Sequence, residues 1–169
     1  MKKRSRGREL ALQLLYQMDL RGRELAEEAP DFLASAERSV EGDEDGDGED
    51  GERVDRETRA FAQRLVLGVR DHWNELDAVI RGVAQNWDIG RMAVIDRNVL
   101  RLATYELLHC RDIPPKVAIN EAIELGKRFS TANSGAFING ILDRIKSKSE
   151  ADGAAPAAAP DEAPGEAGT

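Results

Sequence analysis

Residues 114–145, PPKVAINEAIELGKRFSTANSGAFINGILDRI, constrain the fold of this chain more than any other stretch does. The two prolines at its start suit the first turn of a helix, where a backbone N–H has no helical partner to lose. Apolar residues then recur every three or four positions as far as Leu125. Residues 130–134 supply oxygens that can cap a helix, and a second apolar stripe runs from Phe137 to Ile145. The stretch therefore predicts a helical hairpin with a polar corner.

The rest of the chain shows the same helical spacing. Apolar residues recur at intervals of three and four from 55 to 87, and a break is expected near Gly68 or Gly82. No segment alternates apolar and polar residues between hairpin turns, so strands are not expected. The sequence predicts an all-α fold, a compact bundle of about six to seven helices. Outside the hairpin these helices are expected at 8–21, 24–38 (broken or restarted at Pro30), 55–87 and 95–110.

Two segments differ in composition from this helical body. Residues 41–53, EGDEDGDGEDGER, are acidic and glycine-rich, and residues 149–169 are mostly Ala, Pro, Gly and acids. Such compositions bury too little apolar surface to become ordered. We therefore expect one helical domain over 1–148, with a flexible start at 1–7, a disordered insert at 41–53 and a disordered tail at 149–169.

The acidic insert partly matches a calcium-binding loop. Asp43, Asp45 and Asp47 occupy its first three ligand positions, and Gly48 its turn position. Val54, however, stands where the loop needs a bidentate carboxylate. No calcium site is expected there.

The distribution of charge favours a polyanionic partner, although the formal net charge is −8. Eight acids lie in 41–52 and five in 150–169, without a base in either segment, so the rest of the chain carries +5. The local field, and not the net charge, decides whether a polyanion can dock. The densest positive cluster consists of Lys2, Lys3, Arg4, Arg6 and Arg8. Such a cluster suits neutralisation of RNA phosphates, and the alternative is a solvated tail that aids solubility.

The corner of the predicted hairpin is a second candidate surface. Asn133 and Ser134 would place an amide and a hydroxyl beside unpaired N–H groups at a helix N-terminus, a natural site for a phosphate oxygen. Phe137, one turn later, could stack on a base. The alternative is structural, with Ser134 as a helix cap and Phe137 in the core.

Three blocks of the sequence resemble the NusB family of bacterial transcription antitermination factors. They are RELALQLLYQMDL at 8–20, WDIGRMAVIDRNVLRLATYELL at 87–108, and KVAINEAIELGKRFS followed by AFINGILD in the hairpin. The likeness extends over 5–21 and 56–146. It implies a non-enzymatic RNA-binding factor that binds boxA-type single-stranded RNA with the ribosomal protein NusE and joins an RNA polymerase antitermination complex, notably on ribosomal RNA operons.

The resemblance also suggests roles for particular residues. Arg4, Arg6 and Arg8 fall where the family's RNA-binding arginines lie, and Gln13 and Tyr16 match positions on the same helix. It implies that the corner at 133–137 adjoins these arginines and adds RNA contacts. The exposed edge near Asp96 is expected to bind NusE, although such carboxylates usually are solvated or pair with neighbours such as Arg97 and Arg101.

Two other hypotheses remain open at this point. A similar helical domain precedes the catalytic domain of ribosomal RNA cytosine methyltransferases of the Sun family, so the chain would be a stand-alone RNA-targeting domain. The other is a helical homodimer formed through the 56–87 helix, which would hide the RNA surface.

No catalytic, metal or cofactor site is expected. The two histidines, His72 and His109, lie on different predicted helices, and the adjacent His109 and Cys110 lack metal-ligand spacing. No glycine-rich phosphate loop or nucleophile motif is present. No apolar run approaches the ~20 residues that span a bilayer, and the lone cysteine fits a reducing compartment, so we expect a cytoplasmic protein without a membrane partner.

Overall fold

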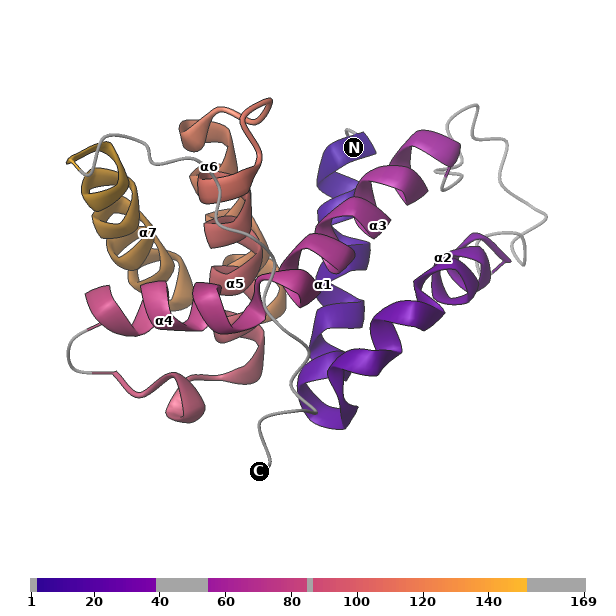
Figure 1. Cartoon of the computed structure of the whole chain (residues 1–169), viewed down its shortest axis with the longest axis horizontal. Coiled ribbons are helices and arrows are strands. Elements are labelled where there is room, and N and C mark those ends of the chain that lie inside the picture. Colours follow the sequence, from indigo (N-terminus) through magenta and orange to yellow (C-terminus); the bar gives the residue numbers. More distant parts are fainter. Residues whose placement is uncertain (1–2, 39–54, 85–86, 152–169) are drawn as a thin grey trace. The chain divides into compact units, whose positions relative to one another are not determined.

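The computed structural model describes residues 3–38, 55–84 and 87–151, all in helices and short connections (Figure 1). These residues form two compact units, one ending at Leu67 and the other beginning at Gly68. The predicted all-α class is confirmed, because the described part of the chain contains seven α-helices and two 3₁₀-helices and no strand. The acidic insert, with the calcium-loop residues, and residues 152–169 lie outside the described residues.

The first unit consists of α1 (Lys3–Arg21), the 3₁₀-helix η1 (Arg23–Glu28), α2 (Ala29–Arg38) and most of α3 (Arg56–Asp71). Its core includes Leu10 of α1, Leu33 of α2 and Ala62 of α3, with at most 2% of each residue exposed. As predicted, α1 ends at Arg21, and the following Gly22 has a φ of +134°, which is accessible to glycine at little cost. Pro30 lies in the first turn of α2, which confirms the predicted restart.

α1 begins five residues earlier than the sequence analysis predicted. Residues 3–7, expected to be flexible, form its first turns. Contacts with α3 explain the difference. Lys3 forms ion pairs with Asp55 and Glu57 at the start of that helix, and Gly7 lies directly against Phe61. Packing of this kind supplies most helix stability in proteins, and the basic sequence of 3–7 gives no sign of it.

The predicted 55–87 helix is wrong in two respects. It breaks at His72, and not at Gly68 or Gly82, which gives α3 and α4 (Trp73–Val83). It also stops at Val83, so Trp87 lies outside the helix. The apolar spacing continues from Val69 to Trp73 without interruption, which is why the pattern gave no sign of the break.

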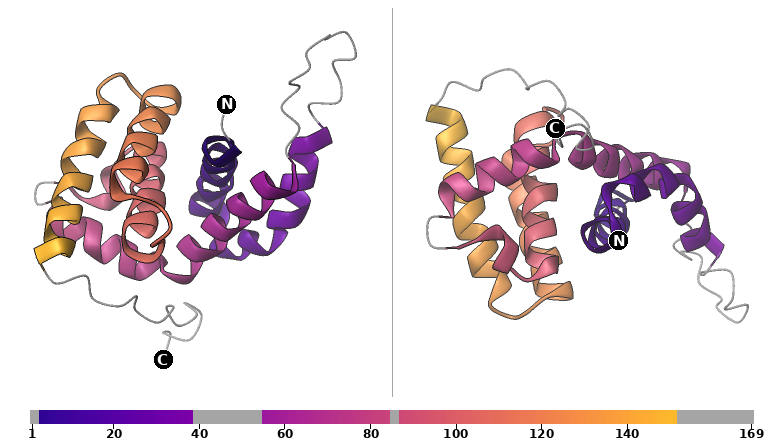
Figure 2. Two further views of the ribbon diagram at one scale, coloured as in Figure 1. Left: turned by 90° about the horizontal axis from the view of Figure 1, so that it is seen from above. Right: turned by 60° about the horizontal axis from the view of Figure 1, so that its bottom comes forward.

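The second unit is built around α5 (Val94–His109), which packs against α4, α6 (Pro115–Phe129) and α7 (Ser134–Ala151). A short 3₁₀-helix, η2 (Ile89–Arg91), precedes α5. The predicted hairpin is confirmed, and Figure 2 shows α6 and α7 side by side. Gly126 makes this packing possible, because a Cβ there would overlap Ile138 of α7. α7 continues to Ala151, three residues beyond the expected end at 148.

A buried ion pair joins α4 to α5. The Arg101 guanidinium donates through Nε to Asp77 Oδ1 at 2.7 Å and through a terminal nitrogen to Oδ2 at 3.1 Å. Its other terminal nitrogen donates to Asn98 Oδ1 at 3.0 Å. The guanidinium also lies over the Trp73 ring, 4.1 Å from the centroid. Only 6% of the Arg101 side chain and 10% of the Asp77 side chain are exposed, so the pair is shielded from solvent screening.

Among the described helices, none combines the length and the apolar character needed to cross a bilayer.

Candidate nucleic-acid interface

The first turn of α1 meets the N-terminus of α3 through a network of charges. Asp55 caps α3, with Oδ1 accepting from the Thr58 N–H at 2.9 Å. Lys3 Nζ lies 2.8 Å from Asp55 Oδ2 and 2.8 Å from Glu57 Oε2. The hydrogen bond from Lys3, with those from Thr58, lowers the pKa of Asp55 to about 2, while the two carboxylates raise the pKa of Lys3. Because exposed ion pairs are weak, a phosphate can compete for Lys3.

One turn further along α3, the Phe61 ring contacts two arginines of α1. The guanidinium carbon of Arg4 lies 4.8 Å from the Phe61 centroid, and that of Arg8 lies 5.3 Å from it. Both are cation–π contacts. Arg8 is only 2% exposed, whereas Arg4 is exposed. Phe61 is itself 7% exposed, so it serves to orient the arginines and offers little ring surface to a base.

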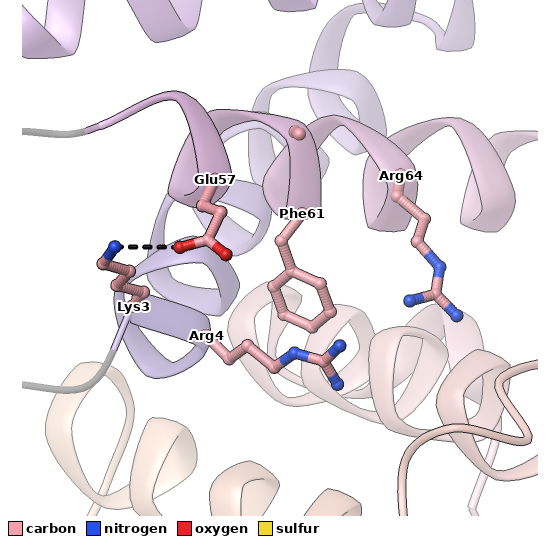
Figure 3. A pocket seen from close by; sticks show the side chains of 6 residues that line it. Lys3, Arg4, Glu57, Phe61 and Arg64 are labelled. Carbon is pink, nitrogen blue, oxygen red and sulfur yellow. Dashed lines mark hydrogen bonds and ion pairs between the residues drawn. The ribbon is translucent and has the colours of Figure 1, made fainter.

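Arg4 and Phe61 line a pocket of about 310 Å³ together with Lys3, Glu57, Ala60 and Arg64. Figure 3 shows the Arg4 side chain beside the Phe61 ring, with Arg64 further along on one side and Lys3 bonded to Glu57 on the other. The lining carries three cations and one carboxylate, so its field favours an anion. We call Lys3, Arg4, Phe61 and Arg64 the basic pocket.

The other residues predicted on this side of the chain are spread along α1. Arg6 donates to Glu9 Oε2 at 2.9 Å. Gln13 is exposed, and Tyr16 is 38% exposed three residues later. Lys2 lies outside the described residues. Of the predicted arginines, Arg4 therefore lines the pocket. Arg8 is buried against the Phe61 ring, and Arg6 pairs with Glu9.

Two members of the basic pocket, Phe61 and Arg64, were not predicted from the sequence. Phe61 lies within the apolar pattern of 55–87, which indicates a helix and no binding site. Their spacing of three residues places them on one face of a helix. A cation three positions from an aromatic residue was therefore the sequence signal that could have indicated this pocket.

In the second unit, Ser134 shapes the corner before α7. Its hydroxyl donates to Ser130 Oγ at 3.0 Å, lies 3.0 Å from Thr131 Oγ1 and accepts from the Thr131 N–H at 3.2 Å. Ser134 is 2% exposed, whereas Asn133 is exposed. Ser134 thus holds the corner in place, and Asn133 is the residue that offers a polar group to solvent.

Phe137 is half-buried and pairs with a residue that the sequence analysis had placed in a helix. The Trp87 ring contacts it edge-on, with 5.2 Å between centroids and 70° between planes. Trp87 is 57% exposed, a large aromatic surface. Phe137 and Trp87 belong to the second unit and the basic pocket to the first, so the expectation that the two adjoin stays a prediction.

Asp96 lies in the first turn of α5, where the helix dipole favours a negative charge. Its Oδ1 atom is buried and has no hydrogen-bond partner among the described residues. The expected pairing with Arg101 is not found, because Arg101 binds Asp77. Arg97 donates to the Gly90 carbonyl at 3.3 Å. Asp96 as a whole is partly exposed, so a partner could approach its carboxylate from solvent.

The two histidines, which the sequence placed on separate helices, come together in the second unit. Their rings stack with 3.9 Å between centroids, and both bind Glu75. Tyr105 stacks on His109 at 5.5 Å, in space left by the absent side chain of Gly68. Burial lowers the pKa of His109, with a smaller contribution from His72, while Glu75 acts in the opposite direction.

Comparison with known proteins decides the family. The model of the NusB family matches residues 5–147. A transcription antitermination protein NusB from Anaeromyxobacter sp. (strain Fw109-5) is 48% identical over 143 residues, covering 85% of this chain and 89% of that protein. The chain belongs to the NusB family. The NusB protein of Geobacter sulfurreducens is also 48% identical, over 83% of this chain and 91% of its own length.

Solved structures agree with this assignment. The structure of T. maritima NusB is 37% identical, with a TM-score of 0.71 over 86% of this chain and 91% of that one. A structure of the antitermination factors NusB and NusE in complex with dsRNA shares the fold, with a TM-score of 0.67 at 24% identity over 88% and 98% of the two chains. Because NusB proteins are transcription antitermination factors, this chain is an antitermination factor and not an enzyme.

Proposed function

We propose that this chain binds boxA-type single-stranded RNA together with the ribosomal protein NusE, as part of an RNA polymerase antitermination complex that supports transcription of ribosomal RNA operons. The observation that carries the proposal is the basic pocket, where Phe61 holds an exposed arginine beside two other cations. The solved complex of a NusB protein with NusE and dsRNA, which has the same fold, supports RNA and NusE as the kinds of partner.

The basic pocket suits RNA phosphate. An arginine binds phosphate with two parallel hydrogen bonds, and a guanidinium already held over a ring loses less freedom when it does so. Lys3 can exchange its exposed carboxylate partners for a phosphate. The pocket thereby supplies salt-dependent affinity with little discrimination between sequences.

Sequence preference requires contacts with bases, and the aromatic pair at the α7 corner offers them. Trp87 exposes more than half of its surface, and Phe137 supports it edge-on. Unpaired bases stack on such rings, and this is a common way in which proteins bind single-stranded RNA. We propose that Asn133 adds a hydrogen bond beside them, while Ser134 acts through the shape of the corner.

We propose that NusE binds near Asp96. A lysine or arginine of a basic partner would pair with the Asp96 carboxylate, because Asp96 is partly exposed in the first turn of α5. A charge-assisted hydrogen bond at such a place is worth about 1.5–3 kcal/mol. Asp96→Asn should therefore weaken NusE binding by at least tenfold, and the exposed Asp143→Asn should leave it unchanged.

The RNA proposal is tested with the double variant Arg4→Ala and Arg64→Ala. Arg8 is kept because its burial beneath Phe61 gives it a structural role. The matched control is Arg21→Ala, an exposed arginine at the other end of α1. Fluorescence anisotropy with boxA-like and scrambled RNA, with and without NusE at two salt concentrations, measures the affinities.

The double variant should lose at least tenfold in affinity for both RNAs. Its plot of log K against log salt should be shallower by about 0.7 for each phosphate contact removed. NusE should raise the affinity for boxA-like RNA, and RNA should raise that for NusE by the same factor. Unchanged RNA affinity in a double variant with normal helical circular dichroism would show that the pocket is not the RNA site.

The other hypotheses fare differently. The relatives are antitermination proteins, so no observation favours a detached methyltransferase domain. The homodimer stays a prediction, which sedimentation at two protein concentrations checks.

A further inference from the structure

We infer that the second unit binds one divalent transition-metal ion through His72, Glu75 and His109. The site would be separate from the nucleic-acid interface proposed above. Its three side chains come from the break between α3 and α4, from the first turn of α4 and from the last residue of α5. They are brought together by the fold, since Glu75 and His109 are 34 positions apart in the sequence.

The geometry converges on a single oxygen atom. Glu75 Oε2 lies 2.8 Å from His72 Nδ1 and 3.0 Å from His109 Nε2. The second oxygen, Oε1, lies 3.2 Å from His109 Nε2. One potential ligand atom from each residue lies within 4.8 Å of both others. Two ring nitrogens and a carboxylate oxygen therefore face one small volume.

Two imidazoles and one carboxylate are a known zinc ligand set, with a fourth position left for water. Zinc bonds of about 2.0–2.1 Å place neighbouring tetrahedral ligand atoms about 3.3 Å apart. Each histidine–glutamate contact would thus lengthen by only a few tenths of an ångström. The N–H protons now pointing at Glu75 must leave those nitrogens, either to the other ring nitrogen or to solvent, because a metal-bound nitrogen carries no proton.

The surroundings favour such an ion. The exposed fractions of the His72, Glu75 and His109 side chains are 11%, 25% and 5%, so the site is sheltered and Glu75 provides access. With neutral imidazoles the three groups carry one negative charge. A single histidine–glutamate hydrogen bond would explain the position of either histidine. It does not require both histidines, which come from different parts of the chain, to meet the same glutamate oxygen.

The test is calorimetric titration of the full, tag-free chain with Zn²⁺. We expect one ion per chain, release by a chelator, and a thermal midpoint about 5–10 °C higher at a hundredfold excess of free zinc over Kd. His72→Gln and His109→Gln should each lower the affinity at least tenfold. Cys110→Ser and the exposed Glu124→Gln serve as matched controls and should bind as the wild type does.

Because other carboxylates of this acidic chain can bind zinc weakly, the double variant of His72 and His109 defines the background. The chain contains only these two histidines, so imidazole ¹⁵N resonances of the wild type report the site even where a variant fails to fold. Both side chains should shift together at one equivalent of zinc. Unshifted imidazole resonances, or equal binding by the folded double variant, would overturn the inference.

Discussion

Removal of Asp77 should destabilise the second unit more than removal of any exposed charge. Asp77 binds one edge of the Arg101 guanidinium with both of its carboxylate oxygens, and Asp77→Ala would leave that cation buried without its counter-ion. Loss of one partner of a buried pair costs about 3–5 kcal/mol. Arg101 would keep Asn98 and the Trp73 ring, so we expect the lower end, about 3 kcal/mol. At 2–4 °C per kcal/mol the thermal midpoint should fall by about 6–12 °C.

Thermal and urea unfolding followed by far-UV circular dichroism provide the measurement. The combined variant Asp77→Leu with Arg101→Met replaces the pair by apolar side chains, and it should be markedly more stable than Asp77→Ala. The single variants Asp77→Leu and Arg101→Met complete the cycle. The change in unfolding free energy of the combined variant, minus the sum of the changes in the two single variants, gives the coupling energy of the pair.

The exposed pair between Glu124 and Lys127 on α6 provides the control. Its charged atoms are 3.9 Å apart and both side chains are more than half exposed. Glu124→Ala should change the free energy of unfolding by less than about 0.5 kcal/mol. If Asp77→Ala is no more destabilising than this control, the assignment of a tightly coupled buried pair is refuted.

Two further predictions concern the packing of α6 and the cap of α3. Gly126→Ala should lower the free energy of unfolding by about 1 kcal/mol, since overlap with Ile138 outweighs the gain in helix propensity. Adding Ile138→Val should relieve the overlap, which melting curves of the single and double variants would show. A higher melting temperature of the Gly126→Ala variant alone would contradict this prediction. Because the pKa of Asp55 falls from 3.8 to about 2 on folding, its charge stabilises the fold above pH 3.8, and this contribution is lost as the pH falls through about 2. Lys3→Ala should return the pKa toward 3.8 in a ¹³C carboxyl titration, and an unmoved midpoint would count against the ion pair.

The hairpin and α5 were predictable because their signals are local. Prolines, apolar spacing and a polar corner all lie within 114–145 and agree with one another, and the 95–110 prediction matches α5 within a residue at each end. Gly22 likewise marks a turn by its own backbone preference. Agreement between local preference and apolar pattern is what makes a segment predictable.

The predictions that failed concern features that depend on contacts between segments far apart in the sequence. The first turns of α1 are held by α3, which begins more than fifty residues after Lys3. The break at His72 interrupts no apolar spacing. A glycine in an apolar helical pattern predicts a break near Gly68, but the missing side chain there makes room for Tyr105. The basic pocket and the histidine cluster are likewise products of tertiary packing, so residue type alone could nominate only some of their members.

Both tryptophans of the chain belong to the second unit, and their environments are opposite: Trp73 is 5% exposed, and Trp87 is 57% exposed. Intrinsic emission therefore follows unfolding of that unit alone, with Trp73 moving into water while Trp87 serves as an internal reference. Far-UV circular dichroism follows the helices of both units. Coincident transitions by the two methods would mean that the units melt cooperatively, whereas an earlier loss of ellipticity at constant emission would assign the weaker fold to residues before Gly68.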